Sequence, residues 1–108
     1  MALASGVTIE IETGRLQFLP GALDYARQGA LPGGLKNNRE FASCAVETGA
    51  IAATLASELE DLLYDPQTSG GLLIALPERD AAGLEGSLEG AYRMGRVVER
   101  REKPIYLL

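Results

Sequence analysis

The clearest pattern near the start of the chain is a strict alternation of apolar and polar residues over residues 7–12. Such alternation predicts a β-strand that buries one of its two faces. After Pro20, which suits a first helical turn, residues 22–28 predict a short helix that Gly29 ends. Apolar residues then recur at helical spacing and predict the clearest helix of the chain, carried by Ile51, Leu55, Leu59, Leu62 and Leu63.

The second half of the chain adds further strands. Residues 72–76 are continuously apolar, which suits a strand buried on both faces. Asp80 can cap a helix that Gly90 ends, and residues 92–99 and 104–108 predict two more strands joined by a charged turn. Around Asn37 and Asn38 we expect a short helix or an irregular turn. This order of elements predicts an α/β (α+β) fold in which helices pack on a mixed β-sheet.

Length and composition limit the architecture and the partners. A chain of 108 residues with 46% hydrophobic content suits one core, so residues 1–108 are expected to form a single domain. The longest apolar runs are far shorter than the roughly 20 residues of a membrane helix, so we expect a cytoplasmic protein with no membrane partner. The net charge of −5 argues against a nucleic-acid partner, because such surfaces neutralise phosphates with clustered Lys and Arg.

Two features concern reactive and charged side chains. Cys44 is the single cysteine and the chain has no histidine, so an intramolecular disulfide and the usual zinc and Cys–His arrangements are absent. We expect Cys44 to be a small, half-buried filler. Basic residues gather near the end of the chain, where we expect a solvated face that could also meet an anionic substrate: Arg93, Arg96, Arg100, Arg101 and Lys103.

Residues 65–71, DPQTSGG, are the chemically richest stretch. Pro66 fixes its own φ, whereas Gly70 and Gly71 allow close approach of the backbone to another group. Thr68 and Ser69 each add a hydroxyl that can donate a hydrogen bond. Two interpretations stay open on these residues alone: a turn that enters a core strand, and a loop that holds a ligand.

This stretch belongs to a longer string that resembles a known family. Residues 62–77 read LLYDPQTSGGLLIALP, which resembles the C-terminal domain of the selenophosphate synthetases, also called selenide, water dikinases. LPGAL at residues 19–23, ARQG at 26–29 and LPGG at 31–34, followed by Asn38, are similar to the family's segments in the same order. GRVV at residues 95–98 resembles the family's closing strand, so the resemblance touches most of the chain.

The resemblance implies a fold and an activity. The fold is that of the C-terminal domains of the aminoimidazole ribonucleotide synthetase superfamily. The activity converts ATP, selenide and water to selenophosphate, AMP and phosphate with Mg²⁺, at a cleft walled by two domains. In this family ATP, the metal-binding aspartates and the catalytic Cys or selenocysteine belong to an N-terminal domain, whose motifs are not found here.

The same resemblance sets expectations for partners. We expect this chain to hold only the C-terminal domain, without its first helix, and to be inactive alone. It would then work with its own N-terminal domain, which binds most of the ATP and Mg²⁺, in a homodimer of the full-length enzyme. Because a domain cut from its partner exposes apolar surface, we also expect self-association.

Site residues can be carried over only where the motifs match. Thr68, Ser69, Gly70 and Gly71 are expected to face the phosphates of the substrate or the selenophosphate product. No catalytic residue and no metal ligand is assigned to this chain, and Cys44 does not match the family's catalytic cysteine. The expected supporting residues of the loop are Asp65, Gln67, Gly33, Gly34 and Asn38.

Two of these positions carry an ambiguity. Asp65 either reaches a metal or accepts amide hydrogens within its own turn. Where the family pattern often has Thr after the paired glycines, this chain has Leu35, which removes one hydroxyl from the loop around Gly33. For all five supporting residues, Gly33, Gly34, Asn38, Asp65 and Gln67, a structural role is at least as well supported as ligand contact.

Two alternatives remain open. One is the C-terminal domain of a sister enzyme, such as an aminoimidazole ribonucleotide synthetase or a hydrogenase-maturation ATPase, against which the QTSGG string at residues 67–71 argues. The other is a non-catalytic binding or dimerisation domain, in which a sheet edge near Tyr106 and Leu108 pairs with a second copy.

Overall fold

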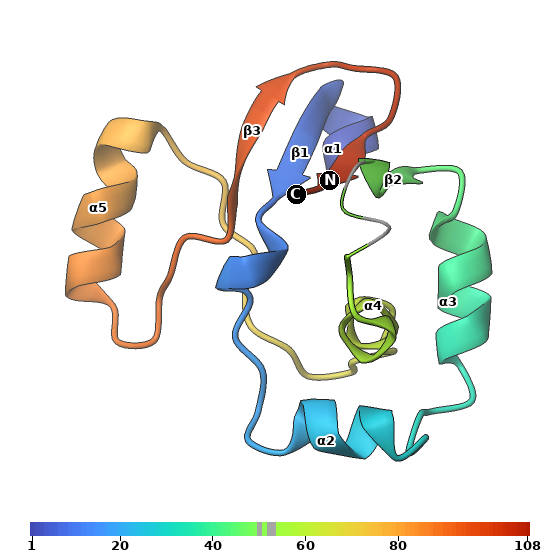
Figure 1. Ribbon diagram of the computed structural model, residues 1–108. Coiled ribbons are helices and arrows are strands. Elements are labelled where there is room, and N and C mark those ends of the chain that lie inside the picture. The colour runs from blue at the N-terminus through green and yellow to red at the C-terminus, as the bar shows by residue number, and fades with distance from the viewer. Residues whose placement is uncertain (50, 52–53) are drawn as a thin grey trace.

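The computed structural model describes residues 1–49, 51 and 54–108 and contains a mixed sheet with surrounding helices (Figure 1). The elements follow one another as α1 (Ala2–Ser5), β1 (Val7–Ile11), the 3₁₀ turn η1 (Thr13–Arg15), α2 (Ala22–Arg27), α3 (Leu35–Ala42), β2 (Val46–Glu47), α4 (Ser57–Leu63), α5 (Glu78–Ser87), β3 (Gly95–Glu99) and β4 (Ile105–Leu107). The expected α+β fold class is confirmed.

The sheet has the strand order β2-β4-β1-β3. β1 pairs antiparallel with β3, whereas β4 runs parallel to both β1 and β2. β4 therefore lies inside the sheet, and the edges are β2 and β3. The expectation of an exposed edge near Tyr106 and Leu108 was wrong, because Tyr106 is paired with Glu10 on one side and Glu47 on the other.

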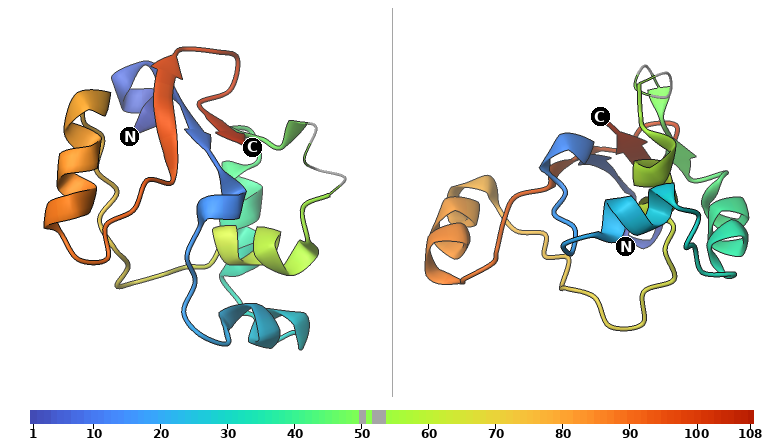
Figure 2. Two further views of the ribbon diagram at one scale, coloured as in Figure 1. Left: turned by 60° about the vertical axis from the view of Figure 1, so that its left-hand side comes forward. Right: turned by 60° about the horizontal axis from the view of Figure 1, so that its bottom comes forward.

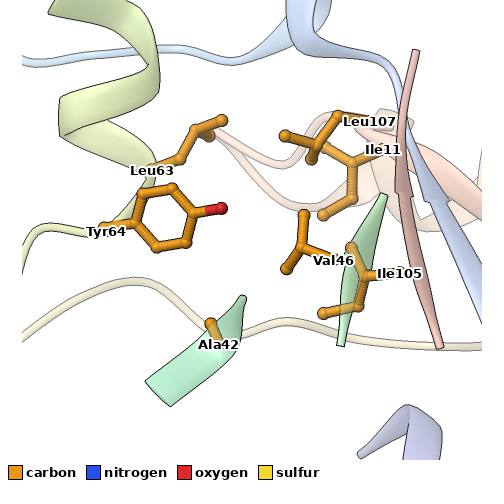
Figure 3. Close-up of a pocket in the computed structure, with 7 residues that line it drawn as sticks. All are labelled: Ile11, Ala42, Val46, Leu63, Tyr64, Ile105 and Leu107. Atoms are coloured by element: carbon orange, nitrogen blue, oxygen red, sulfur yellow. The ribbon is translucent and has the colours of Figure 1, made fainter. Parts of the chain in front are cut away.

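The apolar face of the sheet meets α3 and α4. Ile105 lies between Ile9 and Val46 in the register, and Leu107 lies beside Ile11. These strands and the helices enclose a cavity of about 170 Å³, which is drawn in Figure 3 with the Tyr64 hydroxyl pointing toward the strand side chains. Its lining residues are Ile11, Ala42, Val46, Leu63, Tyr64, Ile105 and Leu107.

The polar face of β1 is the more deeply buried one, contrary to what the alternating pattern suggests. Thr8 has no exposed surface and Glu10 is 2% exposed, whereas Ile9 and Ile11 are half-buried. The Thr8 hydroxyl donates to the Lys103 carbonyl at 2.9 Å and accepts from the Arg101 amide at 2.9 Å. These bonds satisfy the buried hydroxyl and hold the β3–β4 connection over β1.

Glu10 is held by two arginines from that connection and from β3. The Arg96 Nε donates to Glu10 Oε2, and Arg101 Nη1 lies 2.7 Å from Glu10 Oε1. The Arg101 guanidinium also lies over the Tyr106 ring, 5.5 Å from its centre. Arg96 and Arg101 are exposed, as expected of a solvated face, and they also supply the paired cations that a buried carboxylate needs.

The ion pairs of Glu10 predict a dependence of stability on pH. The Arg96 hydrogen bond lowers the pKa of Glu10, burial opposes this effect, and the Arg101 charge adds to the lowering. The stabilisation is therefore present above the ordinary pKa of 4.5 and is lost as the pH falls through the lower pKa of the folded state. Urea denaturation between pH 7 and pH 3 should show Glu10→Gln less stable than wild type at pH 7, with a gap that closes in acid.

The exposed Glu102 offers a matched control for this experiment. Glu102→Gln makes the same change of net charge without removing a buried ion pair. Its stability should follow the wild-type curve throughout. A constant gap between the wild type and Glu10→Gln down to pH 3 would contradict the proposed role of the ionised carboxylate.

The predicted strand over residues 72–76 is not formed. This segment runs as an unpaired connection between α4 and α5 (Figure 1, yellow), and Leu72 is 90% exposed. β1 has β3 on one side and β4 on the other, so a further strand could join only at a free edge of the sheet, and residues 72–76 do not pair there. α5 lies out on this flank, away from α2, α3 and α4, in all three views (Figures 1 and 2).

Several element boundaries also differ from expectation. The helix expected from Ile51 onward begins only at Ser57, because the residue before it, Ala56, is extended with φ −62° and ψ 137°; residues 52 and 53 of that expectation lie outside the described residues. α5 starts at Glu78, so Asp80 lies within its first turn and does not cap it.

Cys44 is exposed, whereas we expected it to be half-buried. Within the described ranges, none of the helices combines the length and apolar character of a membrane span.

Candidate functional site

The loop at residues 65–71 starts where α4 ends. The Tyr64 amide donates to the Asp61 carbonyl at 3.1 Å, and the Asp65 amide reaches back to the Leu62 carbonyl at 3.3 Å. Pro66 follows, and its ring disfavours a helical conformation of the preceding residue. The helix therefore stops at a fixed point and releases the chain into the loop.

The loop lies against the start of α3, so the structure brings two of the predicted segments together. A Cβ on Gly34 would lie 3.3 Å from the Pro66 Cγ, which shows how closely the two residues pack. One turn later, the Asn38 side-chain amide donates to the Tyr64 carbonyl at 3.1 Å. This bond satisfies a carbonyl at the end of α4 that has no partner within its own helix. Gly33 has open space around it, and Leu35 is buried in the core.

Arg39 strengthens the same junction and was not singled out in the sequence. Its Nη2 donates to Asp61 Oδ1 at 2.8 Å, and its guanidinium lies 5.3 Å from the centre of the Tyr64 ring. Burial raises the pKa of the Tyr64 phenol, the negative charge of Glu60 adds to this rise, and Arg39 opposes it. One signal could have found this residue: Arg39 directly precedes residues 40–65, which hold six acidic side chains and no basic one.

Within the loop, Gln67 turns back on its neighbours. The backbone amide of Gln67 donates to the Asp65 carbonyl at 2.8 Å. The side-chain oxygen Oε1 of Gln67 lies 2.7 Å from the position that a Cβ on Gly70 would take. Only glycine fits at position 70 without moving the Gln67 side chain. Thr68 and Ser69 are exposed, and in the described part of the chain their hydroxyls have no hydrogen-bond partner. Both hydroxyls are thus available to an external acceptor.

The sequence of this chain is similar to those of several known proteins. No protein-family model matches this chain. It is 40% identical to the selenide, water dikinase of Clostridium botulinum (strain Eklund 17B / Type B) over 111 residues, which cover 99% of the chain and 31% of that protein. It is also 40% identical to the selenide, water dikinase of Clostridioides difficile (strain 630) over 113 residues, covering all of the chain and 32% of that protein.

A third relative comes from another organism. The selenide, water dikinase of Bordetella bronchiseptica is 39% identical over 112 residues, covering the whole chain and 31% of that protein. This chain is related to the selenide, water dikinases. It spans about a third of the length of these curated relatives.

For a relative of the selenide, water dikinases, the surroundings of the loop matter as much as the loop itself. A hollow of about 1010 Å³ lies between β1, β3, residues 71–76 and α5, and Gln67 and Gly71 are among its lining residues. Its apolar walls include Leu72, Leu73, Ile74, Leu84 and Leu88. Thr68 and Ser69 are not among its lining residues.

The acidic side chains do not make a metal site of their own. Among the residues that the structure describes, no three His, Cys, Asp or Glu side chains gather closely enough to hold an ion. Asp65 is half-buried at the start of the loop. The Thr68 and Ser69 hydroxyls, in contrast, are groups that can donate hydrogen bonds to phosphate oxygens.

Proposed function

We propose that this chain is the C-terminal domain of a selenide, water dikinase. The full-length enzyme would convert ATP, selenide and water to selenophosphate, AMP and phosphate, so that one phosphoryl group goes to selenide and the other to water. Its N-terminal domain would bind most of the ATP and the Mg²⁺, and this chain would supply the opposite wall of the cleft. The observation that carries the proposal is about 40% identity to these enzymes over the whole chain.

The loop is the part of that wall to which we assign contact with the reacting groups. Phosphoryl transfer depends chiefly on positioning and on neutralising the charge that spreads over the phosphate oxygens. Thr68 and Ser69 offer two uncommitted hydroxyls, and Gly70 and Gly71 are exposed beside them. Gly34, Asn38, Asp65 and Gln67 then act as supports that fix the loop, as their packing and hydrogen bonds favour. A homodimer and a cytoplasmic location of the full-length enzyme stay predictions.

Phosphorus NMR of the reaction products tests the proposed function. The isolated chain, mixed with ATP, Mg²⁺ and selenide, should give no product. The full-length enzyme from the same gene should give the selenophosphate resonance together with AMP and phosphate. A mixture of this chain with a separately produced N-terminal domain should regain the selenophosphate signal, since each piece supplies one wall of the cleft.

The full-length protein decides between the outcomes. If it hydrolyses ATP without forming selenophosphate, the selenide assignment is wrong and a sister ATP-dependent enzyme becomes the better interpretation. If it makes selenophosphate while the two pieces do not, even in a verified complex, the assignment stands. In that case the division between the two pieces destroys the cleft.

A further inference from the structure

Arg39 is placed to control the direction in which the chain leaves α4. Its Nη2 bonds to Asp61 at 2.8 Å and lies 3.7 Å from Glu60 Oε2, and its guanidinium carbon lies over the Tyr64 ring, 5.3 Å from the ring centre. All three partners lie in the last turn of α4 or at its C-cap. The first residue of the loop follows immediately, so a shift of this turn moves the loop with it.

Arg39 combines ion pairs with a cation–π contact. Its Nε is buried and finds no acceptor among the described residues, so the guanidinium is held by the Nη2 contacts with Asp61 and Glu60 and by its position over the Tyr64 ring. A buried donor without a partner costs free energy, which argues against stability as the main contribution of this side chain. Lysine could keep the charge near Asp61 but would lose the guanidinium group that lies over the Tyr64 ring.

The neighbouring residue on α3 acts on the same turn. Asn38 donates to the Tyr64 carbonyl at 3.1 Å, and Gly34 packs on Pro66. Arg39 thus completes a set of three contacts by which α3 holds the end of α4 and the start of the loop. Asn38 bonds to a backbone carbonyl at the end of α4, whereas Arg39 contacts side chains there.

We propose that Arg39 is a positioning residue, whose contacts with Asp61 and Tyr64 place the Thr68 and Ser69 hydroxyls at the reacting phosphates. This inference rests on the proposed function of the loop. Arg39 itself touches no substrate. Its removal leaves both hydroxyls in the protein but displaces them, and a displacement of about 1 Å from a distant mutation can cost on the order of a hundredfold in rate.

Arg27 provides a matched control, because it contacts the start of α4, whereas Arg39 contacts its end. It donates to Glu58 Oε1 at 2.8 Å and to Asp24 Oδ1 at 3.0 Å, so it joins α2 to the start of α4. Arg27→Met therefore removes an ion pair of the same kind from α4, but far along the chain from the loop. A general loss of helix packing would affect both arginine variants alike.

The test is a double-mutant cycle on the full-length enzyme. Arg39→Met, Arg39→Lys and Arg27→Met are each combined with the Thr68→Ala/Ser69→Ala change, and kcat/KM for selenophosphate formation is measured beside the melting temperature. We expect Arg39→Met to lose at least tenfold, Arg39→Lys to recover only part of that loss, and Arg27→Met to stay within about twofold of wild type. In the Thr68→Ala/Ser69→Ala background, Arg39→Met should lower kcat/KM by a further factor of less than about two, because the hydroxyls that Arg39 positions are already gone.

The other possible results would contradict either the positioning role of Arg39 or the proposed function of the loop. Losses that multiply in the combined variant, or equal losses in Arg27→Met and Arg39→Met, would show that Arg39 does not act through the loop. If Thr68→Ala/Ser69→Ala loses activity while Arg39→Met and Arg39→Lys do not, the loop function stands and the positioning role falls. If the loop variant keeps wild-type kinetics, the proposed function of the loop is itself wrong. Should Arg39→Met fail to fold, Asp61→Asn removes the same ion pair and replaces it in the cycle.

Discussion

Replacing Thr68 and Ser69 with alanine in the full-length enzyme is expected to lower kcat for selenophosphate formation by on the order of 10² to 10³-fold, the usual effect of removing donors to developing charge. The two hydroxyls are exposed and uncommitted within the described residues, so their removal breaks no contact that holds the fold. The loss should therefore appear in kcat without a matching loss of stability. Steady-state kinetics with phosphorus NMR detection measures the first quantity, and thermal denaturation measures the second.

Two other exposed hydroxyls give the control for this variant. Ser43 and Ser87 each donate to a carbonyl of their own helix end, at 2.7 Å and 3.3 Å. Ser43→Ala/Ser87→Ala should keep wild-type kinetics. Unchanged kcat in the Thr68→Ala/Ser69→Ala enzyme would remove the loop from the active site and leave it as a turn between α4 and the following segment.

Gly95→Val is expected to destabilise the domain by about 3 kcal/mol or more, because overpacking against a rigid backbone is among the costliest single changes. A Cβ at Gly95 would lie 1.9 Å from the Glu10 carbonyl oxygen and 3.2 Å from the Ile11 Cα. The side chain can fit only if β3 moves away from β1. That movement would also separate Arg96 from Glu10, so the buried carboxylate would lose one of its two partners.

Urea denaturation followed by circular dichroism measures this effect. Gly14→Ala is the control, because a Cβ at that position meets no atom within 4 Å. It should leave the denaturation midpoint near that of the wild type. A Gly95→Val protein with the wild-type midpoint would mean that β1 and β3 are not as close as their pairing indicates. The glycine that opens the GRVV motif thus has a physical reason within this chain.

The sequence predicted those elements whose signal is local. The alternation at residues 7–12 marks β1, the Pro20 and Gly29 boundaries frame α2, and GRVV marks β3. β2 has only two residues, too few to show a period, and it exists because β4 pairs with it. The run at residues 72–76 shows the opposite failure, since strongly apolar residues do not by themselves determine whether a sheet has a place for them.

The burial of Thr8 and Glu10 could not be predicted from alternation alone. A polar residue on a strand becomes a core residue only when partners for its atoms arrive from elsewhere. For Glu10 those partners are Arg96 and Arg101, more than 80 positions further along the chain, according to their numbering. The candidate site was likewise only partly predictable from the sequence. The sequence indicated which residues carry donors, whereas the contacts of Asn38 and Arg39 with the end of α4 depend on how two helices pack.

The position of β4 has a consequence for biosynthesis. β4 is the strand between β2 and β1, and it consists of residues 105–107. While the earlier residues leave the ribosome, β1 can pair only with β3 and β2 has no neighbour at all. The nascent domain therefore holds an incomplete sheet until its last strand is released, and contacts of such long sequence separation form slowly. A chaperone that shields the unfilled gap between β1 and β2 would act on this domain until β4 has left the ribosome.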